Sequence, residues 1–184
     1  MQQRHLNRRQ YFCELANTAR TFYMEYLNTY IKLTPDTRVL EIGCGEGGNL
    51  LPFAEKGCQV TGIDICQSRI IEAQTFFTEC HQQGTFICQD FLLTEEPKTE
   101  DERYDLILVH DVIEHIEPSN KRDFLLENLL PSCKVLNINT PQKQKQPKET
   151  NWKQKFQKPQ NENICLTYLN TENKRNFHFL SFDD

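Results

Sequence analysis

A strand that runs directly into a cluster of glycines restricts the possible folds of this chain more than any other sequence feature. Residues 39 to 48 read VLEIGCGEGG, so a short apolar run is followed by four glycines in six positions. Glycine gives up packing and costs conformational entropy, so such a cluster is useful only where the backbone turns sharply or approaches something closely. Its place after a buried strand indicates that the approached object is a ligand.

Apolar strands and helices alternate after this point in the sequence. Strands are expected at RVLEIG, CQVTGIDI, TFICQDF, YDLILVH and KVLNINT. Helices are expected between them at GNLLPFAEKG, QSRIIEAQTFFTECHQQG and SNKRDFLLENLL, the second of them ending at Gly84. This rhythm is typical of a parallel sheet with helices on both faces. The predicted fold class is α/β, a Rossmann-like, doubly wound, mostly parallel sheet with an atypical C-terminal part.

The length of 184 residues suits one domain. The distribution of apolar and polar residues divides this chain into three segments. In residues 1–33, apolar side chains from Tyr11 to Tyr30 recur at spacings of three and four, which predicts a helical cap that packs on the core or covers a ligand cleft. Residues 34–140 form the ligand-binding core. Residues 141–184 are polar, and either close the sheet with a hairpin made by ICLTYLN and FHFLSFDD or form a poorly ordered tail.

The composition excludes several classes of protein. The net charge is −5, which gives no electrostatic footprint for a nucleic acid partner. The eight cysteines include no C-x-x-C pair, which favours free thiols in a reducing compartment over a disulfide framework or a zinc site. No run of 18 apolar residues and no signal-peptide pattern occurs, so a cytoplasmic protein without a membrane span is expected. The oligomeric state is not predicted.

The glycines satisfy a nucleotide-binding pattern. Gly43, Gly45 and Gly48 fit G-x-G-x-x-G between a predicted strand and a predicted helix. Asp64 ends the second strand, 21 residues after Gly43, where a carboxylate can accept hydrogen bonds from both ribose hydroxyls. NAD and S-adenosylmethionine both remain open at this point, as does a simple helix-capping role for Asp64.

Three further features separate these ligands. Glu41 precedes the glycines and gives E-x-G-x-G-x-G, Asp90 and Phe91 follow the third strand, and YDLILVHDVIEHI closes the fourth strand with a polar cluster. Together with VLEIGCGEG, VTGIDI and CQDF, in this order, they resemble the class I S-adenosylmethionine-dependent methyltransferases, with the strand-four segment similar to that of ubiquinone-biosynthesis O-methyltransferases. The resemblance covers residues 38 to 116.

The resemblance implies a set of cofactor-binding residues. In that family the glycine loop holds the amino acid end of the cofactor, an acid two residues before it orders the loop, and the residue after strand four lies beneath the methyl donor. Carried onto this chain, the expected cofactor-binding residues are Glu41, Gly43, Cys44, Gly45, Gly47, Asp64, Ile65, Asp90, Phe91 and His110.

The strand-four cluster also supplies the candidates for chemistry. A sulfonium methyl group is already electrophilic, so the protein needs mainly to align a nucleophile and accept its proton. His110, Asp111 and His115 are the candidate bases. Asp111, Glu114 and His115 would also share one face of a helix, a geometry that suits a divalent metal, but a further ligand is lacking and no metal is predicted.

The predicted function is therefore S-adenosylmethionine-dependent methylation, at oxygen or carbon, of a small or lipid-like acceptor. No glycine occurs after Gly84, and NLLPSCKVLN occupies the place where this family usually has a glycine-bearing turn before strand five. A catalytically silent cofactor-binding or interaction domain of the same fold is the alternative for this reason. An NAD-dependent oxidoreductase is a third reading, disfavoured by Glu41.

Overall fold

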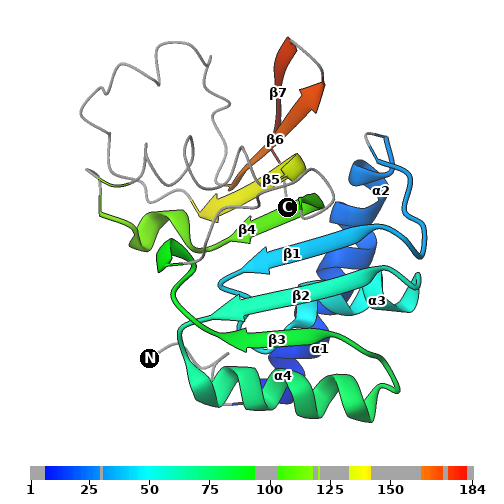
Figure 1. Ribbon diagram of the computed structural model, residues 1–184, viewed down its shortest axis with the longest axis vertical. Coiled ribbons are helices and arrows are strands. Elements are labelled where there is room, and N and C mark those ends of the chain that lie inside the picture. The colour runs from blue at the N-terminus through cyan, green and yellow to red at the C-terminus, as the bar shows by residue number, and fades with distance from the viewer. Residues whose placement is uncertain are drawn as a thin grey trace.

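The computed structural model describes residues 7–29, 31–93, 103–117 and 120, and the backbone of three strands at 133–141, 163–171 and 174–181. One sheet runs through the molecule in the order β3-β2-β1-β4-β5-β6-β7 (Figure 1). Its strands are β1 Arg38–Ile42, β2 Gln59–Asp64, β3 Thr85–Cys88, β4 Tyr104–His110, β5 Cys133–Pro141, β6 Asn163–Thr171 and β7 Lys174–Ser181.

The strand directions confirm the α/β prediction. The four pairings among the first five strands are all parallel, with β1 between β2 and β4. Their carboxyl ends therefore meet at one edge of the sheet, where ligands bind in open α/β folds. The strands β6 and β7 pair antiparallel with each other, and β6 with β5, which is the arrangement expected of a closing hairpin.

Some expectations fall outside the residues that the structure describes. These are the helix predicted at residues 119–130, apart from Asn120, and the polar stretch 142–162. The division of the chain into a cap, a core and a C-terminal segment stays a prediction.

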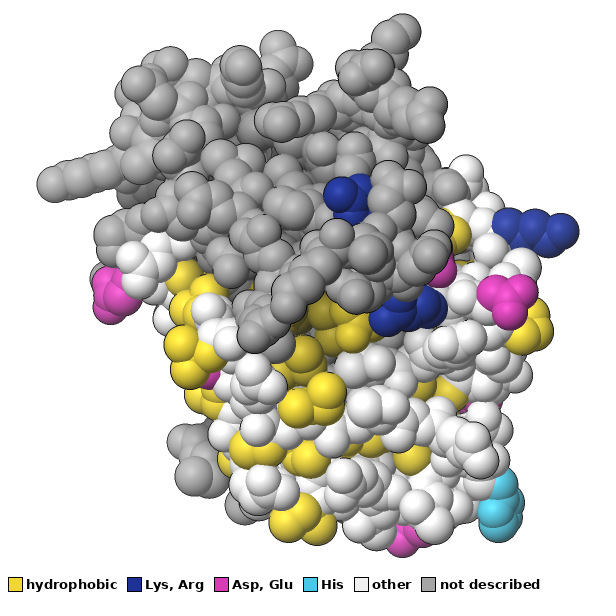
Figure 2. All heavy atoms as spheres, in the orientation of Figure 1, with side chains coloured by type: hydrophobic (Ala, Val, Ile, Leu, Met, Phe, Trp, Pro, Cys, Tyr) yellow, Lys and Arg dark blue, Asp and Glu magenta, His cyan; other side chains and the backbone are white. Residues whose placement is uncertain are grey.

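The described α-helices cover one face of the sheet. They are α1 Arg8–Thr18, α2 Met24–Leu27, α3 Leu51–Glu55 and α4 Gln67–Glu79. Their apolar side chains, including Phe12, Phe53 and Phe77, form one buried cluster with alternate residues of the strands. Because successive strand residues point to opposite faces, Leu40, Ile42, Ile63, Ile107 and Val109 form a second cluster on the other face. Figure 2 shows hydrophobic side chains gathered on the face turned to the viewer.

The N-terminal helix contains a π-helical turn that its sequence period does not reveal. Ala19–Tyr23 is a π-helix that joins α1 to α2 without a break. The extra residue in this turn rotates the next turn of helix about its axis, so that the adjacent Tyr23 and Met24 are both buried. Phe22, expected on the buried stripe, is 48% exposed for the same reason. Within the described residues no helix is long and apolar enough to cross a membrane.

One helix boundary differs from the prediction. Helix α4 ends at Glu79 and not at Gly84. His81 takes a left-handed conformation with φ 55°, which turns the chain away from the helix axis before the glycine is reached. Gly84 instead lies between Val60, Phe77 and Phe86, where a Cβ would be crowded.

Candidate functional site

The glycine loop lies at the carboxyl edge of the sheet, between β1 and α3. The amides of Gly43 and Cys44 both donate to the carbonyl of Ile63 at the end of β2, over 2.8 and 3.1 Å. Gly43, Gly45 and Gly47 have φ of 69°, 52° and 79°, values that other residues rarely adopt. The loop is therefore tied to its neighbouring strand and wound tightly.

Two of the glycines also allow other segments to approach the loop. A Cβ at Gly43 would overlap the side chain of Val112, which follows β4. A Cβ at Gly48 would lie 2.6 Å from the carbonyl oxygen of Phe12 in α1. The N-terminal helix and the segment after β4 thus both rest directly on the glycine loop.

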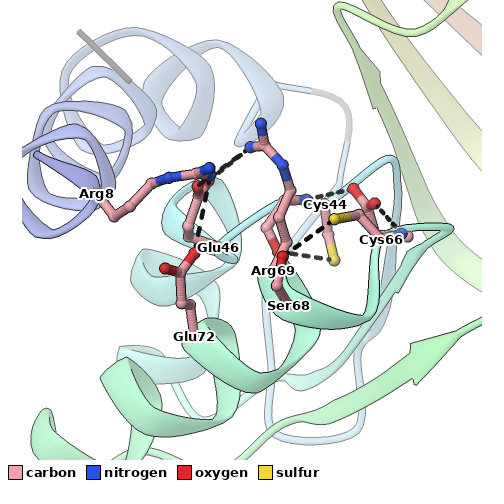
Figure 3. Close-up of polar contacts among 9 residues, drawn as sticks. Arg8, Cys44, Glu46, Cys66, Ser68, Arg69 and Glu72 are labelled. Atoms are coloured by element: carbon pink, nitrogen blue, oxygen red, sulfur yellow. Dashed lines mark hydrogen bonds and ion pairs between the residues drawn. The ribbon is translucent and has the colours of Figure 1, made fainter. Parts of the chain in front are cut away.

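Glu46, inside the loop, is held by two arginines from different helices. Its side chain is fully buried and its carboxylate contacts Arg8 of α1 and Arg69 of α4. Nη1 of Arg69 lies 3.1 and 3.2 Å from the two carboxylate oxygens, and Glu72 lies 3.8 Å from Arg8 (Figure 3). This ion cluster connects α1, the loop and α4.

Asp64 faces the glycine loop from the end of β2. Its Oδ2 accepts from the amide of Gly45 over 2.9 Å, and its Oδ1 accepts from the amide of Cys66 over 2.8 Å. Cys66 is the N-cap residue of α4, so Asp64 does assist the start of that helix. Its partial exposure leaves the carboxylate accessible at the mouth of the loop.

Glu41, two residues before the loop, is a buried acid that no described arginine or lysine contacts. The residue is 1% exposed, and Oε1 accepts from Nδ2 of Asn49 over 2.7 Å. Burial raises the pKa of Glu41 from 4.5 to about 8, although the Asn49 hydrogen bond opposes the shift. Glu41 Oε2 and Asn49 Oδ1 are buried and have no hydrogen-bond donor in the described part of the chain.

His110 lies beside Glu41 at the end of β4. Its Nδ1 is 3.8 Å from Oε1 of Glu41, and its side chain is almost completely buried. The ring of Tyr23, from the π-helical turn, lies against the imidazole with 4.6 Å between ring centres. The helical cap and the sheet thus hold the His110 ring from two sides.

Two more predicted residues line the end of β2. The thiol of Cys44 is buried against Gly62 of that strand, so only the backbone of Cys44 is available to a ligand. Burial raises the pKa of this thiol, which keeps it protonated. Ile65, in contrast, is 76% exposed and offers an apolar surface next to Asp64.

Asp90 and Phe91 follow β3 on the same edge. Asp90 is exposed and caps the short helix Phe91–Leu93 by accepting from the amide of Leu92 over 3.0 Å. Phe91 packs against the apolar cluster on the second face of the sheet. Asp90 therefore has one carboxylate oxygen, Oδ2, that no described backbone amide occupies.

The idea that Asp111, Glu114 and His115 share one helical face is wrong. Asp111 has φ 54° and precedes the 3-10 helix Ile113–His115, so the chain is not helical from 111 to 115. Asp111 and His115 are both exposed. Within the described ranges no group of three His, Cys, Asp or Glu side chains could hold a metal ion.

The site fits the amino acid and ribose portions of a nucleoside cofactor. Glu41, Asp64 and His110 all project toward the helix-covered face, because each is an even number of residues from a side chain in that cluster. The buried acceptor Oδ1 of Asn49 needs a donor, which an ammonium group supplies. Asp64 suits the ribose hydroxyls and Ile65 an apolar ring.

The sequence did not identify several residues that shape this site. They are Arg8, Tyr23, Glu46, Asn49 and Arg69. A charged residue inside a glycine loop was a usable signal for Glu46, since such a side chain must find a partner when the loop is covered. The partners themselves come from distant helices, and no local pattern indicates them.

Comparisons with known proteins point to one family. The profile described as "Methyltransferase domain" matches residues 39–129. The ubiquinone biosynthesis O-methyltransferase of Rickettsia bellii is 30% identical over 117 residues, which cover 64% of this chain and 46% of that protein. The chain thus spans about half the length of this relative.

Solved structures agree in fold. The plantazolicin methyltransferase BpumL, in complex with SAH, is 27% identical, with a TM-score of 0.55, over 73% of this chain and 49% of that one. The magnesium protoporphyrin IX methyltransferase of Synechocystis PCC 6803, with bound SAM, has a TM-score of 0.60 over 76% of this chain and 65% of that one. Its identity of 24% supports the fold alone.

Proposed function

We propose that residues 39–129 form a class I S-adenosylmethionine-dependent methyltransferase domain, and that the chain binds S-adenosylmethionine and methylates a small or lipid-like acceptor. The observation that carries the proposal is the convergence of the wound glycine loop, Asp64 and Glu41 at one sheet edge. Methylation at oxygen is favoured over carbon, because the curated relatives are named O-methyltransferases.

Different residues around the loop would bind different parts of the cofactor. The loop backbone and Oδ1 of Asn49 would hold its amino acid end. Asp64 would bind the ribose hydroxyls, with Ile65, Phe91 and Asp90 around the adenine. The cofactor supplies an electrophilic methyl group on a positively charged sulfur.

His110 is the best-placed candidate base. Its Nδ1 faces Glu41, and its Nε2 would accept the proton of an acceptor hydroxyl. Tyr23 fixes the plane of the ring. Asp111 and His115 are exposed, so we propose them only as secondary candidates.

Calorimetric titration with S-adenosylmethionine, S-adenosylhomocysteine and NADH tests the binding proposal. Micromolar binding of the first two and none of NADH is expected; NADH binding alone would support an oxidoreductase instead. Transfer of radioactive methyl to a panel of phenols and hydroxylated lipids then tests activity. Binding without any turnover would favour the catalytically silent alternative.

A cytoplasmic location completes the proposal. The six cysteines described as free thiols support a reducing compartment. The net charge of −5 supports a small-molecule acceptor over a nucleic acid.

A further inference from the structure

Glu41 is placed where no described arginine or lysine compensates its charge. It lies on β1, on the side of the sheet covered by helices, and is 1% exposed. Its described polar contacts are one hydrogen bond from Asn49 and the His110 imidazole at 3.8 Å. A buried carboxylate without a cation is costly, since desolvation strongly disfavours the charged form.

The other charged groups around Glu41 add to this cost. Asp64 at the end of β2 and Asp111 after β4 are both negative and both disfavour a charge on Glu41. His110 on β4 and Asn49 on the turn before α3 complete its surroundings. Arg69 is occupied by Glu46, and no described ion pair joins an arginine or lysine to Glu41. These surroundings favour the protonated form of Glu41 and raise its pKa to about 8.

A cation that enters the site shifts the equilibrium of Glu41 from its protonated form toward the carboxylate. In a water-excluded environment a positive charge several ångströms away stabilises the carboxylate far more than it would in water. The buried Oε2, which has no donor among the described residues, is the atom available to such a charge.

We propose that Glu41 lets this site distinguish the sulfonium-bearing methyl donor from its uncharged thioether product. The inference rests on the proposed function. When the donor binds, the O–H bond of Glu41 breaks, its proton goes to solvent, and the new carboxylate compensates the sulfonium charge. When the product replaces the donor that charge is gone, and Glu41 takes a proton back from solvent.

Donor and product form a matched pair for this purpose. S-adenosylmethionine and S-adenosylhomocysteine share their adenine, ribose, ammonium and carboxylate groups, and differ by one methyl and one positive charge. Any difference in proton release between them thus reports on a group that responds to the sulfur. Weaker product binding would assist product release.

The experiment is isothermal titration of the full chain with each ligand from pH 6 to pH 9, in pairs of buffers with different ionisation enthalpies. S-adenosylmethionine should release up to one proton more than S-adenosylhomocysteine. Its relative affinity should rise as pH increases toward 8, by at most about tenfold per pH unit, and then level off. Sinefungin, which carries an amine in place of the sulfonium, should behave like the donor.

Glu41→Gln is the decisive variant, because a glutamine can still accept from Asn49. It should bind both ligands with equal proton release and without the pH-dependent preference. Glu25→Gln on the exposed surface of α2 is the matched control and should keep the wild-type behaviour. Equal proton release by the two ligands in wild-type protein would overturn the inference while leaving cofactor binding intact. Absence of binding by either ligand would instead overturn the proposed function.

Discussion

Nη1 of Arg69 lies 3.1 and 3.2 Å from the two carboxylate oxygens of Glu46, so a residue of helix α4 holds a residue of the glycine loop. Arg8 of α1 holds the same carboxylate from the other side. Loop geometry is therefore coupled to two helices whose arginines lie 38 and 23 residues away in the sequence. A ligand that requires this loop also depends on both helices.

Glu46→Gln should destabilise the protein by about 1 to 3 kcal/mol. The change removes a buried charge whose two arginine partners remain, each about a third exposed and so able to regain some hydration. Urea unfolding, followed by circular dichroism, measures the free energy of unfolding of the variant. The exposed pair Arg20–Glu55 is the control, and Glu55→Gln should cost less than about 1 kcal/mol. Equal losses in the two variants would contradict this account.

Gly43→Ala should impair the loop more than Gly45→Ala. Both positions have positive φ, so both variants carry a similar backbone strain of about 1 to 2 kcal/mol. Only the Cβ at position 43 overlaps Val112, whereas that at position 45 lies 3.4 Å from Arg69. The thermal midpoint and the S-adenosylhomocysteine affinity of the two variants test this. Adding Val112→Ala to Gly43→Ala should recover part of the loss.

Asp64→Ala should weaken S-adenosylhomocysteine binding by about 1 to 3 kcal/mol, because it removes the charged acceptor that we propose for the ribose hydroxyls. Calorimetry gives the affinity. Asp36→Ala, exposed in the turn before β1, should leave it unchanged. Unchanged affinity in the Asp64 variant would mean that the ribose is held elsewhere.

The stability of the free protein should fall as pH rises from about 4.5 to about 8. Folding raises the pKa of Glu41, so between these pH values the unfolded chain has lost this proton while the folded protein still binds it. A rise in pH therefore favours the unfolded state. The expected slope from this one group is at most about 1.4 kcal/mol per pH unit. Urea unfolding at several pH values measures it. Glu41→Gln should reduce this dependence, and an identical slope in the variant would count against a raised pKa.

Local sequence was sufficient for the strands and the loop. The apolar run YDLILVH occupies Tyr104–His110 as β4, and VLEIGCGEGG forms a strand and a left-handed glycine turn. Gly57, with φ 86°, ends the helix that follows the loop. These features depend on hydrophobic period and on backbone sterics, which act over a few residues.

Local sequence was insufficient where the conformation of one turn or one residue changes which of the following side chains face the sheet. The π-helical turn at Ala19–Tyr23 brings Tyr23 onto His110 and turns Phe22 outward, although the apolar spacing is compatible with a regular helix. The positive φ of Asp111 likewise excludes a regular helix from 111 to 115, although the D-x-x-E-H spacing would suit one helical face. In both places packing against the sheet outweighs a weak local preference.

The sequence by itself determined that an α/β sheet would present a glycine loop, an acid before it and an acid after the second strand at one edge, because these follow from chain order and strand direction. Only the tertiary structure decided which partners the acids in and before the loop receive. Among the described residues Glu46 receives two arginines while Glu41 receives none, although the two lie five residues apart in the sequence. Burial and the approach of distant helices set the free energy of a charge, and neither is encoded in the residues next to it.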